Sequence, residues 1–322
     1  MLLNHPRRLA ILTVFVWTFG AATAKFVASH SGFALFALSM VVTYCCFQIC
    51  ERRGGAWVSL GWRDLFSKTG LASLSGYGIY WLCYAQSFRS TSDVVLPAAL
   101  NYTWPLFTVI FSEAFFREET IAPATRRVSW TGMLLGMVGV VIVISRGDLS
   151  SFLTAPWTPI LWGLCAGASY GFFGAYSSTV PGNRQLHFLT LSSLSGFFFL
   201  APLAGYELLS APLPSLQIVL ITILLSILLE GLGYYTWTRA NRLAKEQHLN
   251  VASLSSIMYA LPFLSTLTVS MLYGQGERLS ISLWIGLAFI VLSSAICQHA
   301  EAIAAGWTRA RLPSNPTISR DL

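Results

Sequence analysis

The chain has 322 residues, of which 55% are apolar and only 10% are charged. Soluble domains carry roughly 25% charged residues, so the composition excludes an ordinary cytosolic enzyme. The formal net charge of +7 comes from short basic clusters between apolar runs, a pattern typical of a multi-pass membrane protein in a lipid bilayer, and it does not indicate a nucleic-acid partner.

Ten apolar runs, bounded by charged residues, glycine and proline, follow one another along the chain. Each is close to the length of about 20 residues that a membrane-spanning helix needs. The predicted spans are 9–28, 32–50, 65–87, 93–116, 129–145, 159–180, 187–205, 216–238, 250–273 and 281–299. We therefore predict an all-α membrane protein of ten transmembrane helices.

The first apolar run has an alternative interpretation as a signal peptide. Arg7 and Arg8 precede it, and Ala22-Thr23-Ala24 resembles a small-residue cleavage site. We favour a membrane span, because the run is long for a signal peptide and its removal would leave an odd number of spans.

The basic residues are unevenly divided between the two sides of the predicted membrane. With both termini in the cytoplasm, sixteen of the 20 Lys and Arg residues fall on the cytoplasmic side and the other four on the opposite side. This predicts a multi-pass inner (plasma) membrane protein with cytoplasmic N- and C-termini. The segment 301–322 is predicted to be a flexible cytoplasmic tail.

The chain resembles itself when it is shifted by 157 positions. The matched pairs are Gly76 with Gly233, Tyr77 with Tyr234, Tyr102 with Tyr259 and Pro105 with Pro262. These matches predict two five-span halves, 1–148 and 149–300. Because five is odd, the second half must be inverted relative to the first, an arrangement that places a shared site near the midplane and permits alternating access. Gene duplication in a membrane protein of another function is the alternative.

Polar and aromatic residues follow one face of four predicted spans at helical spacing. They include Tyr77 and Tyr80 in the third span, Asn101 and Pro105 in the fourth, Glu230, Tyr234 and Trp237 in the eighth, and Tyr259 and Pro262 in the ninth. Because an unsatisfied polar group in hydrocarbon is costly, we expect these stripes to face inward and to enclose a wet, aromatic-lined cavity for a small substrate.

Two features of these stripes have more than one interpretation. Pro105 and Pro262 each remove a backbone donor and release a carbonyl that could accept from a substrate ammonium group; both could also kink helices only for packing. Glu230 is the deepest carboxylate on the chain. It could carry protons, pair with an amine, or be a hydrogen-bonded packing residue.

No cofactor or metal is expected. The six cysteines lie within apolar runs and lack paired CxxC spacing. A catalytic set of paired acids or clustered histidines at midplane is also missing from the pattern, so an intramembrane enzyme is disfavoured.

Segment 94–106, VVLPAALNYTWPL, resembles the fourth-helix signature of the drug/metabolite transporter superfamily (DMT, EamA type). Its Asn-Tyr-x-Trp-Pro core resembles the YddG-type aromatic amino acid exporters, and Trp17, Tyr77 and Tyr259-x-x-Pro262 match as well. The resemblance implies a ten-helix basket of two inverted halves around a central cavity that releases aromatic and other neutral amino acids. Among the residues it implies for the pocket are Trp17, Tyr102, Trp104 and Tyr170; Tyr170 stands where such relatives commonly carry Trp.

We therefore predict an exporter of aromatic or neutral amino acids that works by alternating access. A polyspecific exporter of organic cations is the main alternative. Phosphorylated substrates are disfavoured because Lys25 is the only cationic candidate for the cavity, and a receptor or scaffold would leave the repeat unexplained. Transport could be driven by proton exchange or proceed by facilitated diffusion, and the sequence favours neither. It also does not indicate an oligomeric state.

Overall fold

The computed structural model describes residues 5–30, 32–53, 62–91, 95–116, 121–145, 148, 150, 156–273 and 281–311. Every regular element in these ranges is helical, so the predicted all-α class is confirmed. Helices occupy each of the ten ranges that the sequence predicts as spans, although several of them are interrupted.

The helices of the first predicted half are α1 (Pro6–Trp17), α2 (Gly20–Ala28), α3 (Gly32–Arg53), α4 (Trp62–Leu65), α5 (Lys68–Leu74), the π-helical segment η2 (Ser75–Ile79), α6 (Tyr80–Arg89), α7 (Val95–Asn101), α8 (Trp104–Phe115) and α9 (Pro123–Ser145).

Those of the second predicted half are α11 (Trp157–Ser177), the short 3₁₀ helix η3 (Gly182–Arg184), α12 (Gln185–Ser210), α13 (Leu216–Leu225), the π-helical segment η4 (Ser226–Gly233), α14 (Tyr234–Glu246), α15 (Val251–Ser255), the 3₁₀ segment η5 (Ser256–Tyr259), α16 (Ala260–Tyr273), α17 (Ile281–Gln298) and α18 (Ala300–Arg311).

By length and apolar composition alone, fewer of these helices qualify as membrane spans than the sequence predicts. Within the described residues, five stretches pass: Pro6–Ala28, Gly32–Arg53, Pro123–Val143, Gly182–Ser210 and Leu216–Glu246. A sixth is added if α17 and α18, which are bent by 71° relative to each other, are counted as one span. The other ranges hold helices that are shorter or more polar, so the structure supports a membrane protein with five or six clearly apolar spans.

Five of the predicted spans change helix type or break near their middle. In the first, a turn at Thr18 and Phe19 separates α1 from α2. α5 continues into α6 through η2, and α13 continues into α14 through η4. α7 ends before a turn at Tyr102 and Thr103, and η5 separates α15 from α16. These two breaks come before Pro105 and Pro262 and not at them, because proline fits the first turn of a helix well and disfavours helical geometry in the residue before it.

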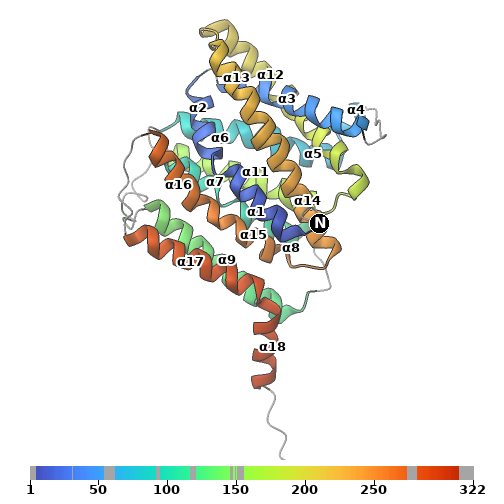
Figure 1. Ribbon diagram of the computed structural model, residues 1–322, viewed down its shortest axis with the longest axis vertical. Helices are drawn as coiled ribbons and strands as arrows, with labels where there is room; N and C mark the ends of the chain where they lie inside the picture. The colour runs from blue at the N-terminus through green and yellow to red at the C-terminus, as the bar shows by residue number, and fades with distance from the viewer. Residues whose placement is uncertain are drawn as a thin grey trace, which may run out of the picture.

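Helices that are distant in sequence pack side by side. The two most extensive pairings join α9 to α17 and α3 to α12, and Figure 1 shows α9 and α17 running together along one edge of the molecule. α11 packs against α6, α7 and α8, and α1 packs against α14 and η4. The broken helices therefore meet in the interior of the bundle.

The prediction that residues 301–322 form a flexible tail is wrong for the first part of this segment. Residues 300–311 form α18, which extends away from the bundle in Figure 1. Its alanine content favours a helix, and Glu301 lies in the first turn, where an acidic side chain complements the helix dipole. The rest of the tail lies outside the described residues.

Candidate functional site

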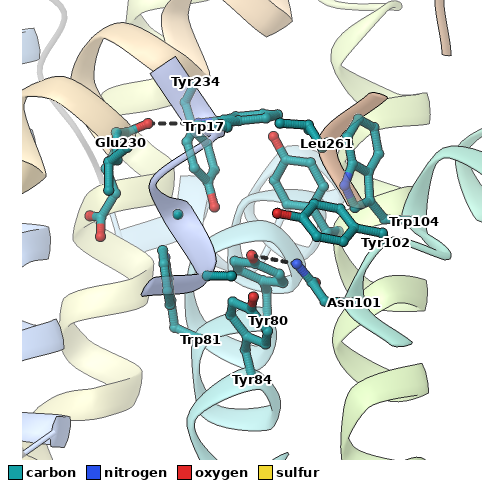
Figure 2. A pocket seen from close by; sticks show the side chains of 14 residues that line it. Trp17, Tyr80, Trp81, Tyr84, Asn101, Tyr102, Trp104, Glu230, Tyr234 and Leu261 are labelled. Carbon is teal, nitrogen blue, oxygen red and sulfur yellow. Dashed lines mark hydrogen bonds between the residues drawn. The ribbon is translucent and has the colours of Figure 1, made fainter. Parts of the chain in front are cut away.

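A central cavity lies where the broken helices meet, and Figure 2 shows the side chains around it. It is lined by Trp17, Gly20, Ala21, Tyr80, Trp81, Tyr84, Asn101, Tyr102, Trp104, Tyr170, Leu229, Glu230, Tyr234 and Leu261. These residues come from α1, α2, α6, α7, α8, α11, η4, α14 and α16, and from the turn between α7 and α8. The cavity has a volume of about 50 Å³, which suits a few water molecules and is well below the roughly 300–1,000 Å³ of most ligand pockets.

Trp17, the last residue of α1, lies at the centre of an aromatic cluster. Its ring centroid is 6.0 Å from that of Trp104 and 5.7 Å from those of Tyr170 and Tyr234, all edge to face. This is a favoured geometry for aromatic rings. The close approach of α1 to η4 requires Gly233, where a Cβ atom would lie 2.2 Å from the indole nitrogen of Trp17.

Each π-helical segment presents a main-chain carbonyl to a ring of this cluster. The Trp17 indole N–H donates to the carbonyl of Leu229 in η4, with an N to O distance of 2.9 Å. The Tyr234 hydroxyl donates to the carbonyl of Gly76 in η2, at 3.3 Å. π-Helical turns inside α-helices occur frequently at functional sites, and here both are tied to the cavity wall.

Three fully buried polar groups of the lining have no hydrogen-bond partner among the described residues. They are the indole nitrogen of Trp81, the side-chain carbonyl of Asn101 and the hydroxyl of Tyr170. The Asn101 amide nitrogen donates to the Tyr80 hydroxyl at 3.4 Å, and the Tyr102 hydroxyl bonds to Ser265. Because buried polar groups normally find partners, the three unpartnered groups indicate that water or a ligand completes the site.

Glu230 is the one carboxylate in the lining. It is 4% exposed, and one of its oxygens accepts from the Thr43 hydroxyl at 3.3 Å. The described residues provide no ion pair to it. Figure 2 shows its carboxyl at the edge of the group, apart from the hydroxyls of Tyr80 and Tyr84.

The structure brings eight of the thirteen predicted site residues to the cavity wall: Trp17, Tyr80, Asn101, Tyr102, Trp104, Tyr170, Glu230 and Tyr234. Tyr77 and Trp237 lie outside the lining; their ring centroids are 4.4 Å from Tyr234 and 5.1 Å from Trp104, respectively. Their predicted contact with substrate stays a prediction.

Tyr259 lies in a different place from its counterpart Tyr102. It packs in a separate apolar cluster of α9, α15 and α17, and its hydroxyl donates to the carbonyl of Met133 at 3.3 Å. Pro105 and Pro262 are buried near the helix breaks but do not line the cavity. A role in substrate binding stays a prediction for all three.

Sequence reasoning did not include Gly20, Ala21, Trp81, Leu229 and Leu261 among the site residues, and it placed Tyr84 only on the stripe of the third span. Trp81 follows Tyr77 by four positions and precedes Tyr84 by three, so helical spacing could have found it. The apolar residues carry no chemical signal that separates a cavity wall from ordinary packing. In the ranges that the structure describes, no group of three or more His, Cys, Asp and Glu side chains could hold a metal ion.

No protein-family model matches the chain. The chain is similar to YedA of Escherichia coli K12, an uncharacterized inner membrane transporter, with 28% identity over 202 residues, which cover 62% of this chain and 60% of that protein. YedA of E. coli O157:H7 gives the same values. The match therefore spans less than two thirds of these relatives.

One solved crystal structure of a protein superposes on this chain with a TM-score of 0.70 and 21% identity, covering 94% of this chain and 98% of its own. This likeness shows a shared fold. Together, the similarity to YedA and the apolar helices support a membrane transporter.

Proposed function

We propose that this protein is an inner-membrane exporter of the drug/metabolite transporter superfamily that carries aromatic and other neutral amino acids. The observation that carries the proposal is the central cavity. It is ring-lined, and among the described residues the fully buried polar atoms of its lining that lack a hydrogen-bond partner belong to Trp81, Asn101 and Tyr170.

These three groups match the two ends of an amino acid. The Trp81 indole N–H can only donate and the Tyr170 hydroxyl can donate, which suits a carboxylate. The Asn101 carbonyl can only accept, which suits an ammonium group. The surrounding rings offer edge and face contacts to an apolar or aromatic side chain, so the cavity is complementary to a neutral amino acid.

The packing supports two inverted halves. Gly76 of η2 faces a ring of α11, because its Cβ would lie 2.3 Å from Phe173, while Gly233 of η4 faces Trp17 of α1. A shift of 157 positions relates Gly76 to Gly233 and takes Phe173 to position 16, next to Trp17. Each half thus receives a ring from the first helix of the other half.

Transport then proceeds by alternating access. The cavity is too small for an aromatic amino acid, so the halves must separate on one side to admit substrate and on the other to release it. Both termini face the cytoplasm, in agreement with the distribution of basic residues, and the similarity to a transporter favours this function over catalysis.

The test is counterflow of labelled phenylalanine into liposomes that contain the purified protein and unlabelled phenylalanine. Asn101→Ala should raise the KM for phenylalanine at least tenfold at equal protein in the membrane, because it removes the acceptor. Ser210→Ala, at the exposed end of α12, is the control. Unaltered counterflow in N101A would remove Asn101 from the site, and no counterflow of any neutral amino acid by the wild type would refute the function.

Export of organic cations is the second candidate. It is favoured by Glu230, a carboxylate without a cationic partner among the described residues, beside rings that attract cations. Quaternary amines should then inhibit phenylalanine counterflow competitively, whereas a selective amino acid exporter should be insensitive to them.

A further inference from the structure

We infer that Glu230 carries the proton of a proton-substrate exchange, and that it receives this proton through a side cavity separate from the substrate cavity. This inference rests on the proposed function, since it concerns how transport at the same site is driven.

Glu230 stands in the wall between two cavities. The second, called here the side cavity, is lined by Thr23, Val27, Phe36, Ser39, Trp81, Thr222, Leu225, Ser226, Leu229 and Glu230. Trp81, Leu229 and Glu230 line both cavities. The side cavity has a volume of about 20 Å³, which suits one water molecule.

Hydroxyl groups connect the carboxyl to the side cavity. The Thr43 hydroxyl lies 3.3 Å from a Glu230 oxygen, and the Ser39 and Ser226 hydroxyls lie 2.7 Å apart. Thr23 and Thr222 add two more hydroxyls to the same lining. Hydroxyls both donate and accept, so with one water they can pass a proton. Asn101 and Tyr170, two of the three groups proposed to bind substrate, line only the other cavity.

The side cavity leads toward one end of the bundle. Val27 is one residue before the end of α2, Phe36 is in the second turn of α3, and Thr222 is the seventh residue of the continuous helical stretch Leu216–Glu246. In the proposed orientation this is the outer end, where a cell that maintains a proton gradient supplies protons.

The charge around Glu230 suits reversible protonation. The titratable groups that face it are the phenols of Tyr77, Tyr80 and Tyr234. The lining residues from α2, α3 and α13 are uncharged, and Lys25 of α2 lines neither cavity. A carboxylate buried without a cation is costly, and a proton removes that cost.

The exchange balances as a simple proton transfer. A hydronium ion at the outer end gives a proton to a Glu230 carboxylate oxygen, so an O–H bond of hydronium breaks, an O–H bond to Glu230 forms, and water and a neutral carboxylic acid remain. After the halves rock, the acid releases this proton to water on the inner side, and substrate moves outward in the same cycle. No oxidation, reduction or further reactant is involved.

The experiment compares two rates in the same liposomes: phenylalanine accumulation driven by an imposed pH gradient, and counterflow without a gradient. Wild-type protein should accumulate phenylalanine, and Glu230→Gln should lower the ratio of the two rates at least tenfold. The double variant Ser39→Ala/Ser226→Ala, which changes only the side cavity, should lower the ratio at least threefold with unaltered counterflow. Glu207→Gln, a carboxyl that lines neither cavity, is the control.

A ratio in E230Q equal to that of the wild type would overturn the inference, as would counterflow in the wild type with no response to the gradient. The second result would leave the proposed function intact. Absence of all counterflow in the wild type would instead refute the proposed function.

A readout that needs no transport completes the test. Because Trp81 lines both cavities beside Glu230, tryptophan fluorescence of the purified protein should show a pH-dependent step. The step should be lost in E230Q and in Trp81→Phe, and kept in E207Q. A wild-type titration identical to that of E230Q would overturn the inference whichever substrate the protein carries.

Discussion

The two π-helical segments make similar contacts but differ in chemistry. η2 and η4 occupy related places in the two halves, each holds a glycine against a ring of the other half, and each gives a carbonyl to a ring donor. The residue that corresponds to Glu230 after the shift of 157 positions is Ser73. Ser73 is fully buried, and its hydroxyl has no partner among the described residues.

The comparison distinguishes positions that the proposed repeat must keep, the two glycines, from a position that can differ between its halves. A Cβ atom at Gly76 or Gly233 would clash with the ring that faces it, so the proposed repeat must keep both glycines. The shift of 157 positions relates Ser73, a neutral hydroxyl in the α-helix α5, to Glu230, an acid in the π-helical segment η4. In the proposed arrangement of two similar halves, the proposed proton site therefore belongs to the second half only.

The largest effect is expected where the two segments are most alike. In Gly76→Ala the new Cβ would lie 2.3 Å from the Phe173 ring, and such overpacking costs about 1–3 kcal/mol. We expect a lower Tm in detergent and at least a tenfold loss of phenylalanine counterflow.

The matched control is Gly205→Ala in α12, where a Cβ would meet nothing within 4 Å. Alanine is the better helix former, so this variant should be as stable as the wild type or more so. Equal Tm values for G76A and G205A would contradict the close packing of η2 against α11.

A smaller effect is expected from the two ring donors, which allows the segments to be ranked. Trp17→Phe removes the donor 2.9 Å from the Leu229 carbonyl, and Tyr234→Phe removes the donor 3.3 Å from the Gly76 carbonyl. A buried group left without its partner costs about 1–3 kcal/mol, and the shorter bond is the stronger one. W17F should therefore lower the Tm and the maximal counterflow rate more than Y234F; the reverse order would show that η2 is the more firmly held segment.

Helical spacing in the sequence predicted much of this arrangement. The predicted stripes of Tyr77 and Tyr80, and of Asn101 and Pro105, are all buried, because residues at steps of three and four share one side of a helix. The all-α class followed from composition for a similar reason, since a bilayer admits few backbone solutions.

Residue spacing could not predict how close two helices lie to each other, or whether a buried side chain lines the cavity. Tyr102 and Tyr259 match in the repeat, but only the tertiary packing of α9 and α17 decides that Tyr259 is enclosed away from the cavity. Residue spacing also did not predict the π-helical segments or the helix α18. Side chains such as Leu229 and Leu261 look like any packing residue until the cavity beside them is seen.

Tyr102 and Tyr259, which match in the repeat, allow a third comparison, in which we expect only one of the two variants to change the KM for phenylalanine. Tyr102→Phe removes a hydroxyl from the cavity wall that also bonds to Ser265, and it should raise the KM for phenylalanine about threefold. Tyr259→Phe removes a hydroxyl bonded to Met133 and should leave the KM unchanged while lowering the Tm slightly. A larger KM change in Y259F would place the substrate on the other side of the repeat.

The smallest effect concerns the ends of the helices. Glu207 of α12 accepts from the main-chain N–H groups of Phe33 and Ala34, at 2.7 and 3.0 Å, and pairs with Arg89. It thus joins α12 and α6 to the start of α3, where a negative charge complements the helix dipole.

Glu113 is the matched control. It makes only a part-exposed ion pair with Arg126, at 3.0 Å, and such pairs contribute little to stability. Glu207→Gln should lower the Tm by a few degrees, in line with about 1 kcal/mol for a lost cap, with the KM unchanged, while Glu113→Gln should stay within error. Equal Tm values would mean that the N-terminus of α3 is held by its packing against α12 and not by this carboxylate.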